Sequence, residues 1–191
     1  MARYQVGIRT EARILEATRE LLGEFGLDGT TLKAICDRAE VRVGSFYNLF
    51  DSKETVVLRV VAEAIAAVDP DPAHAGTETL NDLVEAYIAF FTNESIVARI
   101  YVQIAVSGAL NIGELHHRIE RHHEQRVDRF RAAMQRGNPA LSAVDATERT
   151  EILLATLNGL AFRAALNADF DFARHARAMA NEARSEAPAA D

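Results

Sequence analysis

The sequence has no tryptophan, a single cysteine and only four prolines among its 191 residues. One cysteine, Cys36, excludes an intramolecular disulfide, and a chain of this length needs none to hold a core. No stretch resembles a signal peptide or a membrane span, so we expect a cytoplasmic protein with no membrane partner. Hydrophobic residues make up 49% of the chain, drawn largely from Ala, Leu, Val and Ile, which favours packed helices over sheet.

The formal net charge of −7 argues against a nucleic-acid partner only if the charge is spread evenly. It is not spread evenly, because residues 1–59 hold nine basic and nine acidic side chains. The whole negative charge therefore lies in the residues after 59. Several of the early basic residues precede the first helix or lie at helix starts, where they could converge on phosphates. The alternative is that they are ordinary solvated charges.

Residues 31–50, TLKAICDRAEVRVGSFYNLF, predict two short helices joined by a tight turn. Apolar residues of the first helix recur at spacings of three and four, and Thr31 is placed to cap its free N–H groups. In the second helix Phe46 and Phe50 lie four residues apart and form the buried side. Ser45, Asn48 and Leu49 are left facing outward, as a helix that lies on a nucleic acid requires.

These residues resemble the N-terminal helix-turn-helix domain of TetR-type transcriptional regulators. The resemblance covers residues 8–68 and rests on Gly26-Leu27-Asp28-Gly29-Thr30-Thr31-Leu32, Ile35, Ala39, Val41, Gly44-Ser45-Phe46-Tyr47, Phe50 and Ser52-Lys53-Glu54. The chain departs from the common family pattern twice. Glu40 stands in the turn where relatives often carry a glycine, and Leu49 stands where they often carry a histidine near the end of the recognition helix.

A helix that enters the major groove reads base edges with its N-terminal turn. We predict that Arg42 contacts a guanine edge or a phosphate and that Ser45 bonds a base or a phosphate. Val43 is expected to pack against thymine methyl groups, and Gly44 to let the backbone come close.

Other contacts hold the register through phosphates or come from the preceding helix. Lys33 lies where similar proteins place a second base-reading side chain, whereas Tyr47 and Lys53 suit phosphate oxygens. The predicted DNA-binding residues are Thr31, Lys33, Arg42, Val43, Gly44, Ser45, Tyr47, Asn48, Leu49 and Lys53.

The whole pattern predicts an all-α chain of about nine helices. The predicted domains are a helix-turn-helix DNA-binding domain at 8–68, an effector-binding and dimerisation domain at 69–186, and a flexible tail at 187–191. One predicted helix, 10–25, precedes the helix-turn-helix. After it we predict a helix that runs to Val68, a helix capped at Thr79, and the helices 95–107, 111–136, 145–167 and 172–184.

Aromatic and aliphatic residues of the second domain could line a cavity for a largely hydrophobic small-molecule effector with few polar contacts. The alternative for each is plain core packing. The predicted pocket residues are Tyr87, Phe90, Phe91, Tyr101, Ile104, Leu115, His116, Ile119, Phe130 and Phe162.

The helix predicted at 145–167 has two apolar stripes, which implies two packing partners. The family resemblance implies that one partner is a second subunit, through a two-fold four-helix interface. The alternative is that both stripes close a monomeric core. The predicted homodimer interface is Leu153, Leu157, Leu160, Ala161, Ala164, Phe172, Ala176 and Met179.

Four histidines occur in HHRIERHHE, residues 116–124. His116, Glu120 and His123 share one helix face, a spacing that could hold a metal ion. Flanking arginines favour a solvated polar face instead, so we predict no metal and no cofactor. His116 or His123 could also be a polar contact of the cavity.

These patterns predict a dimeric repressor that binds a pseudo-palindromic double-stranded DNA operator and leaves it when an effector binds. An activator of the same fold and a helical interaction module that no longer binds DNA are the alternatives. An enzyme is not predicted, because no nucleophile, acid–base pair or phosphate-binding loop is found. The operator sequence, the effector and the regulated genes are not encoded in these patterns.

Overall fold

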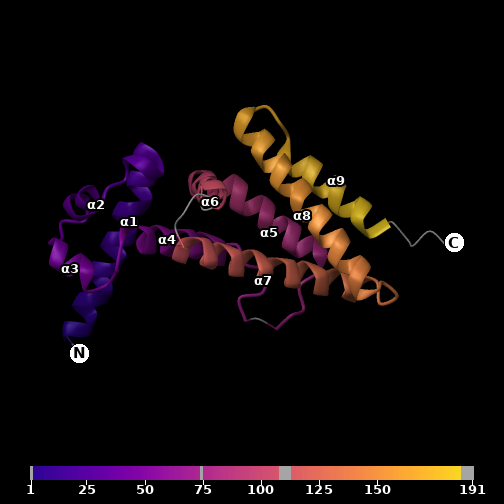
Figure 1. Ribbon diagram of the computed structural model, residues 1–191, viewed down its shortest axis with the longest axis horizontal. Coiled ribbons are helices and arrows are strands. Elements are labelled where there is room, and N and C mark those ends of the chain that lie inside the picture. Colours follow the sequence, from indigo (N-terminus) through magenta and orange to yellow (C-terminus); the bar gives the residue numbers. More distant parts are fainter. Residues whose placement is uncertain (1, 74, 108–112, 186–191) are drawn as a thin grey trace. The chain divides into compact units, whose positions relative to one another are not determined.

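The computed structural model describes residues 2–73, 75–107 and 113–185, and the side chains of 7–73, 75–103 and 120–184. This part of the chain is all-α as predicted, with nine helices and no strand (Figure 1). It divides into two compact units, which we call unit 1 (Met1–Ala67 with Glu94–Leu110) and unit 2 (Val68–Asn93 with Asn111–Asp191). Within the described residues, no helix has the length and apolarity that a membrane crossing demands.

Unit 1 is built around its first helix. It contains α1 (Ala2–Gly29), α2 (Leu32–Arg38), α3 (Val43–Tyr47), α4 (Lys53–Ala67) and α6 (Ser95–Ser107). α1 contacts α2, α4 and α6, and α4 also contacts α6. The sequence analysis assigned 95–107 to the second domain, whereas the packing groups α6 with α1 and α4. The domain boundaries themselves stay a prediction.

The predicted stop of the first helix at Gly26 corresponds to a break in the backbone. Gly26 has φ 67° and ψ −171°, a conformation that only glycine adopts readily, and it interrupts the regular helix inside α1. The Thr30 hydroxyl then donates to the Gly26 carbonyl at 2.7 Å. Fully buried side chains from four helices, Ile14, Leu22, Ile35, Phe46 and Val56, fill the core of this unit.

Unit 2 is a bundle of α5 (Leu80–Asn93), α7 (Gly113–Gly137), α8 (Ala143–Leu166) and α9 (Phe172–Ser185). α8 and α9 lie side by side as an antiparallel pair, with α5 and α7 against them (Figure 1). One continuous core runs through all four helices and includes Tyr87, Phe130, Leu153, Leu157 and Ala176.

Two predicted helix starts differ in outcome. The capping box at Thr79 is confirmed, because the backbone N–H of Asp82 donates to the Thr79 hydroxyl and the Asp82 carboxylate accepts from the Thr79 N–H at 2.8 Å. The predicted start of α8 at Asp145 is wrong. Ser142 is the N-cap and accepts from the Asp145 N–H at 3.1 Å, so the helix begins at Ala143.

Candidate nucleic-acid interface

The predicted helix-turn-helix is present as α2 and α3. The Thr31 hydroxyl caps α2 by accepting from the Ala34 N–H at 3.1 Å, as predicted. In α3 the side chain of Phe46 is fully buried, and Phe50 just beyond the helix is 6% exposed. These two rings hold α3 against the rest of unit 1, which fixes the face that it presents outward.

The outward face of α3 carries several of the predicted contact residues. Val43 is 47% exposed and Tyr47 is 55% exposed, although both side chains are largely apolar. The rings of Tyr47 and Phe46 are nearly perpendicular, at 89°, with their centroids 5.7 Å apart. Leu49, just past the helix, is 37% exposed. A short helix that shows this much apolar and aromatic surface has a contact surface left for another molecule.

Gly44 faces open space on the same side. A Cβ atom added to Gly44 would meet nothing within 4 Å, and its backbone has no positive φ that would demand glycine. Because glycine inside a helix is less stable than alanine, the fold alone does not explain this residue.

The turn between α2 and α3 contains Glu40, one of the two departures from the family pattern. Glu40 has φ 51°, the left-handed conformation that favours glycine. Arg13 of α1 holds the turn, because its guanidinium donates to the carbonyl oxygens of Ala39 and, at 2.9 Å, of Glu40. The sequence analysis missed this role of Arg13, although a non-glycine residue at a turn position occupied by glycine in relatives indicates that the turn needs support.

Most cations of unit 1 are paired within the unit. Arg38 binds Glu20 at 2.9 Å and Glu24 at 2.8 Å, and its hydrogen bond lowers the pKa of Glu24. Lys33 pairs with Asp37 at 2.5 Å, and this hydrogen bond raises the pKa of the lysine. Lys53 donates to the carbonyl of Leu27 at 3.3 Å. Two of the predicted DNA contacts are therefore engaged by the protein itself.

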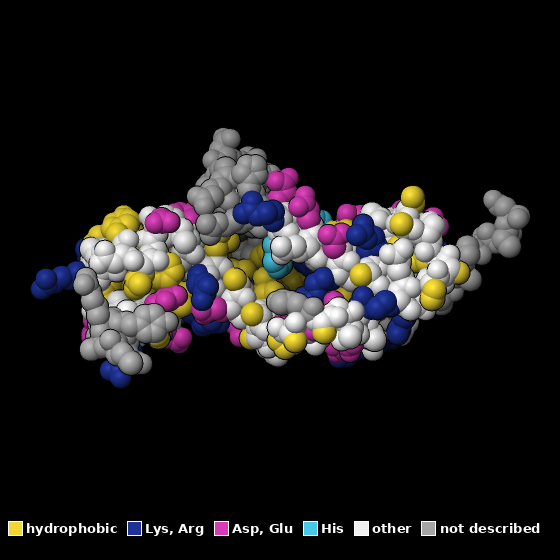
Figure 2. Space-filling view, turned by 90° about the horizontal axis from the view of Figure 1, so that it is seen from below, with side chains coloured by type: hydrophobic (Ala, Val, Ile, Leu, Met, Phe, Trp, Pro, Cys, Tyr) yellow, Lys and Arg dark blue, Asp and Glu magenta, His cyan; other side chains and the backbone are white. Residues whose placement is uncertain are grey.

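Arg42 differs from these cations. It is the N-cap residue of α3, its side chain is exposed, and it forms no ion pair with any described side chain. Basic and acidic side chains are interspersed over the face in Figure 2, without a broad basic patch. Because most other described cations of unit 1 are paired, electrostatic attraction to phosphates would depend on a few placed groups such as Arg42.

The predicted effector residues that the structure describes do not line one common cavity. Tyr87, Phe90 and Phe130 are buried in unit 2, and Phe91 stacks near Tyr87 with ring centroids 4.8 Å apart. Phe162 is 59% exposed, so it lies on the surface of the chain. Tyr101 belongs to unit 1. The others, Ile104, Leu115, His116 and Ile119, lie outside the described side chains. The pocket stays a prediction.

A polar corner of unit 2 was not predicted. The Nε atom of Arg126 in α7 is buried without a hydrogen-bond partner in the described structure, and the guanidinium lies 5.7 Å from the centre of the Tyr87 ring. The Tyr87 hydroxyl is 2.6 Å from the Asn158 side-chain oxygen, to which it donates. An arginine with a buried, unsatisfied N–H favours an anion or another acceptor beside it. Arg126 lies two residues after the histidine run, which the sequence analysis took for a solvated face.

Two histidines of that run, His122 and His123, are among the described side chains, whereas His116 of the possible metal set lies outside them. Burial first, and then the charge of Arg126, lowers the pKa of His122 to about 4, so it is neutral. The Nδ1 atom of His123 lies 3.2 Å from Arg126 Nη2. Among the described residues, no three His, Cys, Asp or Glu side chains gather as metal ligands.

The residues of the predicted dimer interface lie in or against the core of unit 2, and the interface stays a prediction. Leu153, Leu157 and Ala161 of α8 and Phe172 and Ala176 of α9 are buried in the core of unit 2. The other predicted members, Leu160, Ala164 and Met179, are partly buried against the same core. The exposed apolar stripe of α8 is the opposite one, made of Ile152, Ala155, Gly159, Phe162 and Leu166.

Residues 14–60 match the model of the family described as bacterial regulatory proteins, tetR family. The HTH-type transcriptional regulator UidR of Escherichia coli strain K12 is 30% identical over 106 residues, which cover 53% of this chain and 53% of UidR. The chain therefore spans little more than half the length of this curated relative.

Solved structures match over more of the chain. A TetR transcription regulator from Haloarcula marismortui aligns with a TM-score of 0.75 at 19% identity, over 92% of this chain and 96% of that chain. SmeT, the repressor of the Stenotrophomonas maltophilia multidrug efflux pump SmeDEF, aligns as its triclosan complex with a TM-score of 0.69 at 19% identity, over 91% and 89%. Identities this low show the fold alone.

The matched proteins are regulators and not enzymes, in agreement with the sequence analysis. The family model covers the described helix-turn-helix and the α1 core that supports it. Residues 14–60 therefore carry the helix-turn-helix domain of the tetR family of bacterial regulatory proteins, and the described part of the chain shares the all-α fold of the matched structures.

Proposed function

We propose that the protein is a DNA-binding transcriptional repressor that acts as a homodimer on a pseudo-palindromic operator. The observation that carries the proposal is the exposed face of α3, where Arg42, Val43 and Tyr47 are exposed and a Cβ atom at Gly44 would meet only open space. A side chain for phosphate or guanine, an apolar contact for thymine and a bare backbone are the elements that a recognition helix uses.

The stripe on α8 supports a dimer. Its members, Ile152, Ala155, Gly159, Phe162 and Leu166, recur at spacings of three and four on the side opposite the buried Leu157. Ala155 and Gly159 lie between large residues and allow a facing helix to approach closely. A two-fold axis beside α8 would bury the same stripe of both subunits.

The effector in this proposal carries an acidic group. Arg126 offers a buried N–H that has no described acceptor, next to the aromatic rings of Tyr87 and Phe91. A ligand with an apolar body and one anionic group would pack on these rings and accept the hydrogen bond from Arg126. SmeT, a repressor of the same fold, forms a complex with the small molecule triclosan, which supports a small-molecule effector here.

The test is a selection of duplex DNA from a randomised library, followed by fluorescence anisotropy with the selected sequence at physiological salt. Gly44→Ala is the sharpest variant, because alanine favours the helix by about 1 kcal/mol and nothing in the fold opposes its methyl group. We expect Gly44→Ala to bind DNA at least tenfold more weakly while its thermal stability is unchanged or higher.

Arg42→Ala should weaken binding by a similar factor and reduce its salt dependence, whereas Arg59→Ala, which removes an arginine paired with Glu63 on α4, serves as the matched control. Failure to select any sequence would overturn the proposed function. Equal binding by Gly44→Ala, Arg42→Ala and the parent would instead overturn the assignment of α3 as the reading helix.

A further inference from the structure

Unit 2 contains a cavity of 360 Å³ that the proposed function does not use. It lies where residues 77–80 and α8 meet the ends of α7 and α9, away from the Arg126 corner, with which it shares no lining residue. Its size is in the range of small-molecule sites. The residues that decide its chemistry are Glu78, Met134, Arg136, Leu141, Arg149 and Arg184.

The lining is strongly basic for an acidic protein. Three arginines face a single carboxylate, although the chain as a whole has a net charge of −7. A guanidinium has five N–H donors. Among the described residues, Arg136 and Arg184 give only Nη2 to hydrogen bonds, the first to the backbone oxygen of Glu78 and the second to the side-chain oxygens of Asn81 and Asn181. Donors of both arginines remain for an anion.

Glu78 adds an acceptor that has no donor. Its side chain is only 4% exposed, and its Oε1 accepts from Arg129 Nε at 3.1 Å, while Oε2 has no hydrogen-bond partner in the described structure. Arg136 Nη2 lies 3.8 Å from Oε2, beyond hydrogen-bond distance. Leaving a buried acceptor unpaired costs about 1–3 kcal/mol, so a donor is missing at this wall.

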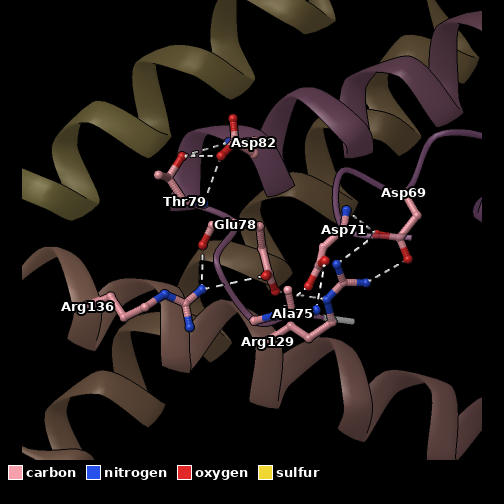
Figure 3. A network of polar contacts seen from close by, with 9 residues as sticks. Asp69, Asp71, Ala75, Glu78, Thr79, Asp82, Arg129 and Arg136 are labelled. Carbon is pink, nitrogen blue, oxygen red and sulfur yellow. Dashed lines mark hydrogen bonds and ion pairs between the residues drawn. The ribbon is translucent and has the colours of Figure 1, made fainter. Parts of the chain in front are cut away.

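The neighbouring side chains do not supply that donor. Asp71 lies beside Glu78, but hydrogen bonds from the backbone N–H groups of Ala75 and Gly76, and to a smaller extent the side chain of Glu78, lower the pKa of Asp71, so that it is ionised and has no proton to donate. Arg129 is already committed to Asp69, at 2.8 and 3.0 Å, as well as to Glu78 (Figure 3). Oε2 therefore has no donor among the described groups, and Glu78 lines the cavity.

We infer that this cavity binds a small apolar-substituted α-hydroxy carboxylate. The carboxylate would accept from Arg136 and Arg184, and the hydroxyl would donate to Glu78 Oε2. The apolar substituent would lie on Met134 and Leu141, which line the same cavity. Glu78 is linked through Arg129 to Asp69, two residues after the end of α4, so the ligand would tighten the segment that follows α4.

The test uses the full chain without DNA and three probes in isothermal titration: 3-phenyllactate, 3-phenylpropionate, which lacks the hydroxyl, and 3-phenyllactamide, which lacks the charge. We expect 3-phenyllactate to bind at least tenfold more tightly than either of the other two. Arg136→Gln and Glu78→Gln should each remove most of that preference. Arg184→Gln, on another wall of the cavity, should weaken the binding of the two carboxylates, 3-phenyllactate and 3-phenylpropionate.

Arg131→Gln is the matched control, since Arg131 lies on α7 outside the cavity and pairs with Asp128 at 2.8 Å. Circular dichroism checks that each variant is folded. No binding of 3-phenyllactate, or equal loss in Arg131→Gln and Arg136→Gln, overturns the inference. Because no DNA is present, and because Arg126→Gln should leave this binding unchanged, the outcome is independent of the proposed regulator function.

Discussion

The two units expose apolar surface in different ways. In unit 1, three of the six exposed large apolar residues, Val43, Tyr47 and Leu49, gather within seven residues at α3, beside buried phenylalanines, and the other three, Ile8, Phe25 and Ile96, are scattered over α1 and α6. In unit 2, every large apolar residue that is exposed in the described part, Val144, Ile152, Phe162 and Leu166, lies on α8. The first surface belongs to a short motif, whereas the second is one of two similar stripes on a long helix. Local sequence therefore specifies the first surface but not the second.

The largest expected effect is the loss of stability caused by a substitution in the buried stripe of α8. Leu157 is fully buried, so Leu157→Ala should lower the free energy of unfolding by about 2–5 kcal/mol. Urea denaturation followed by circular dichroism measures this loss. The matched control is Ile152→Ala on the exposed stripe, which should change the stability of the monomeric unit far less. Equal losses in the two variants would mean that both stripes are buried in one subunit.

A second effect concerns the buried polar groups of unit 2. Because burial lowers the pKa of His122 to about 4 from 6.5, the unfolded chain binds a proton that the folded chain does not bind between these values. Stability should therefore fall as the pH drops from 6.5 to 4, by about 3 kcal/mol at 1.36 kcal/mol per pKa unit. Urea denaturation at pH 7, 6, 5 and 4.5 measures the slope.

His122→Gln should flatten that slope, whereas His175→Gln, which changes an exposed histidine of α9, should not. Asp71 and Asp82 have lowered pKa values, through hydrogen bonds from the backbone at Ala75 and Thr79 respectively, and lose their contributions mostly below this window. Identical slopes in the parent and His122→Gln would mean that the buried histidine does not resist protonation.

The exposed stripe should control subunit association. Phe162→Glu places a charge in the centre of the proposed interface, and we expect the dimer dissociation constant to rise about 100-fold, or about 2.7 kcal/mol. Light scattering over a concentration series gives the mass, with Phe162→Leu as the control that keeps the surface apolar. A dimeric mass for Phe162→Glu at every concentration would contradict the proposed interface.

The pattern of correct and wrong predictions follows the range of the interactions involved. The Thr31 cap, the break at Gly26 and the buried Phe46 depend on neighbours within a few residues, and all three were predictable. The buried face of α8 depends on α5, α7 and α9, because both stripes have the same helical period. Periodicity shows that the helix has two apolar faces, but it does not show which of them is buried.

The same argument applies to the polar residues. Arg126 and Glu78 gain their roles from partners far along the chain, such as Tyr87 for the first and Arg129 for the second. No spacing in the sequence links these residues, so their sites could not have been predicted. Ser142 is different, since its bond to Asp145 is local and the capping pattern was present in the sequence.

The smallest effect tests how far local sequence specifies unit 1. Glu40 holds the left-handed conformation at φ 51°, which costs an L residue about 1–2 kcal/mol. Glu40→Gly removes that cost but gives the unfolded chain more freedom, worth about 0.4–1 kcal/mol. The bonds from Arg13 go to backbone oxygens and survive the change, and the Arg13–Glu40 ion pair at 3.6 Å is too exposed to matter much. We expect a net gain of about 0.5 kcal/mol, a rise in Tm of about 1–2 °C.

Glu40→Ala separates the backbone effect from the charge effect. Alanine removes the carboxylate but keeps the left-handed strain, so it should not raise the melting temperature. Both variants remove one negative charge beside α3 and should therefore tighten DNA binding to a similar, small degree at low salt. If alanine stabilises the protein as much as glycine, the strain at Glu40 is not what distinguishes this turn from its glycine-containing relatives, and the carboxylate itself is the unfavourable element.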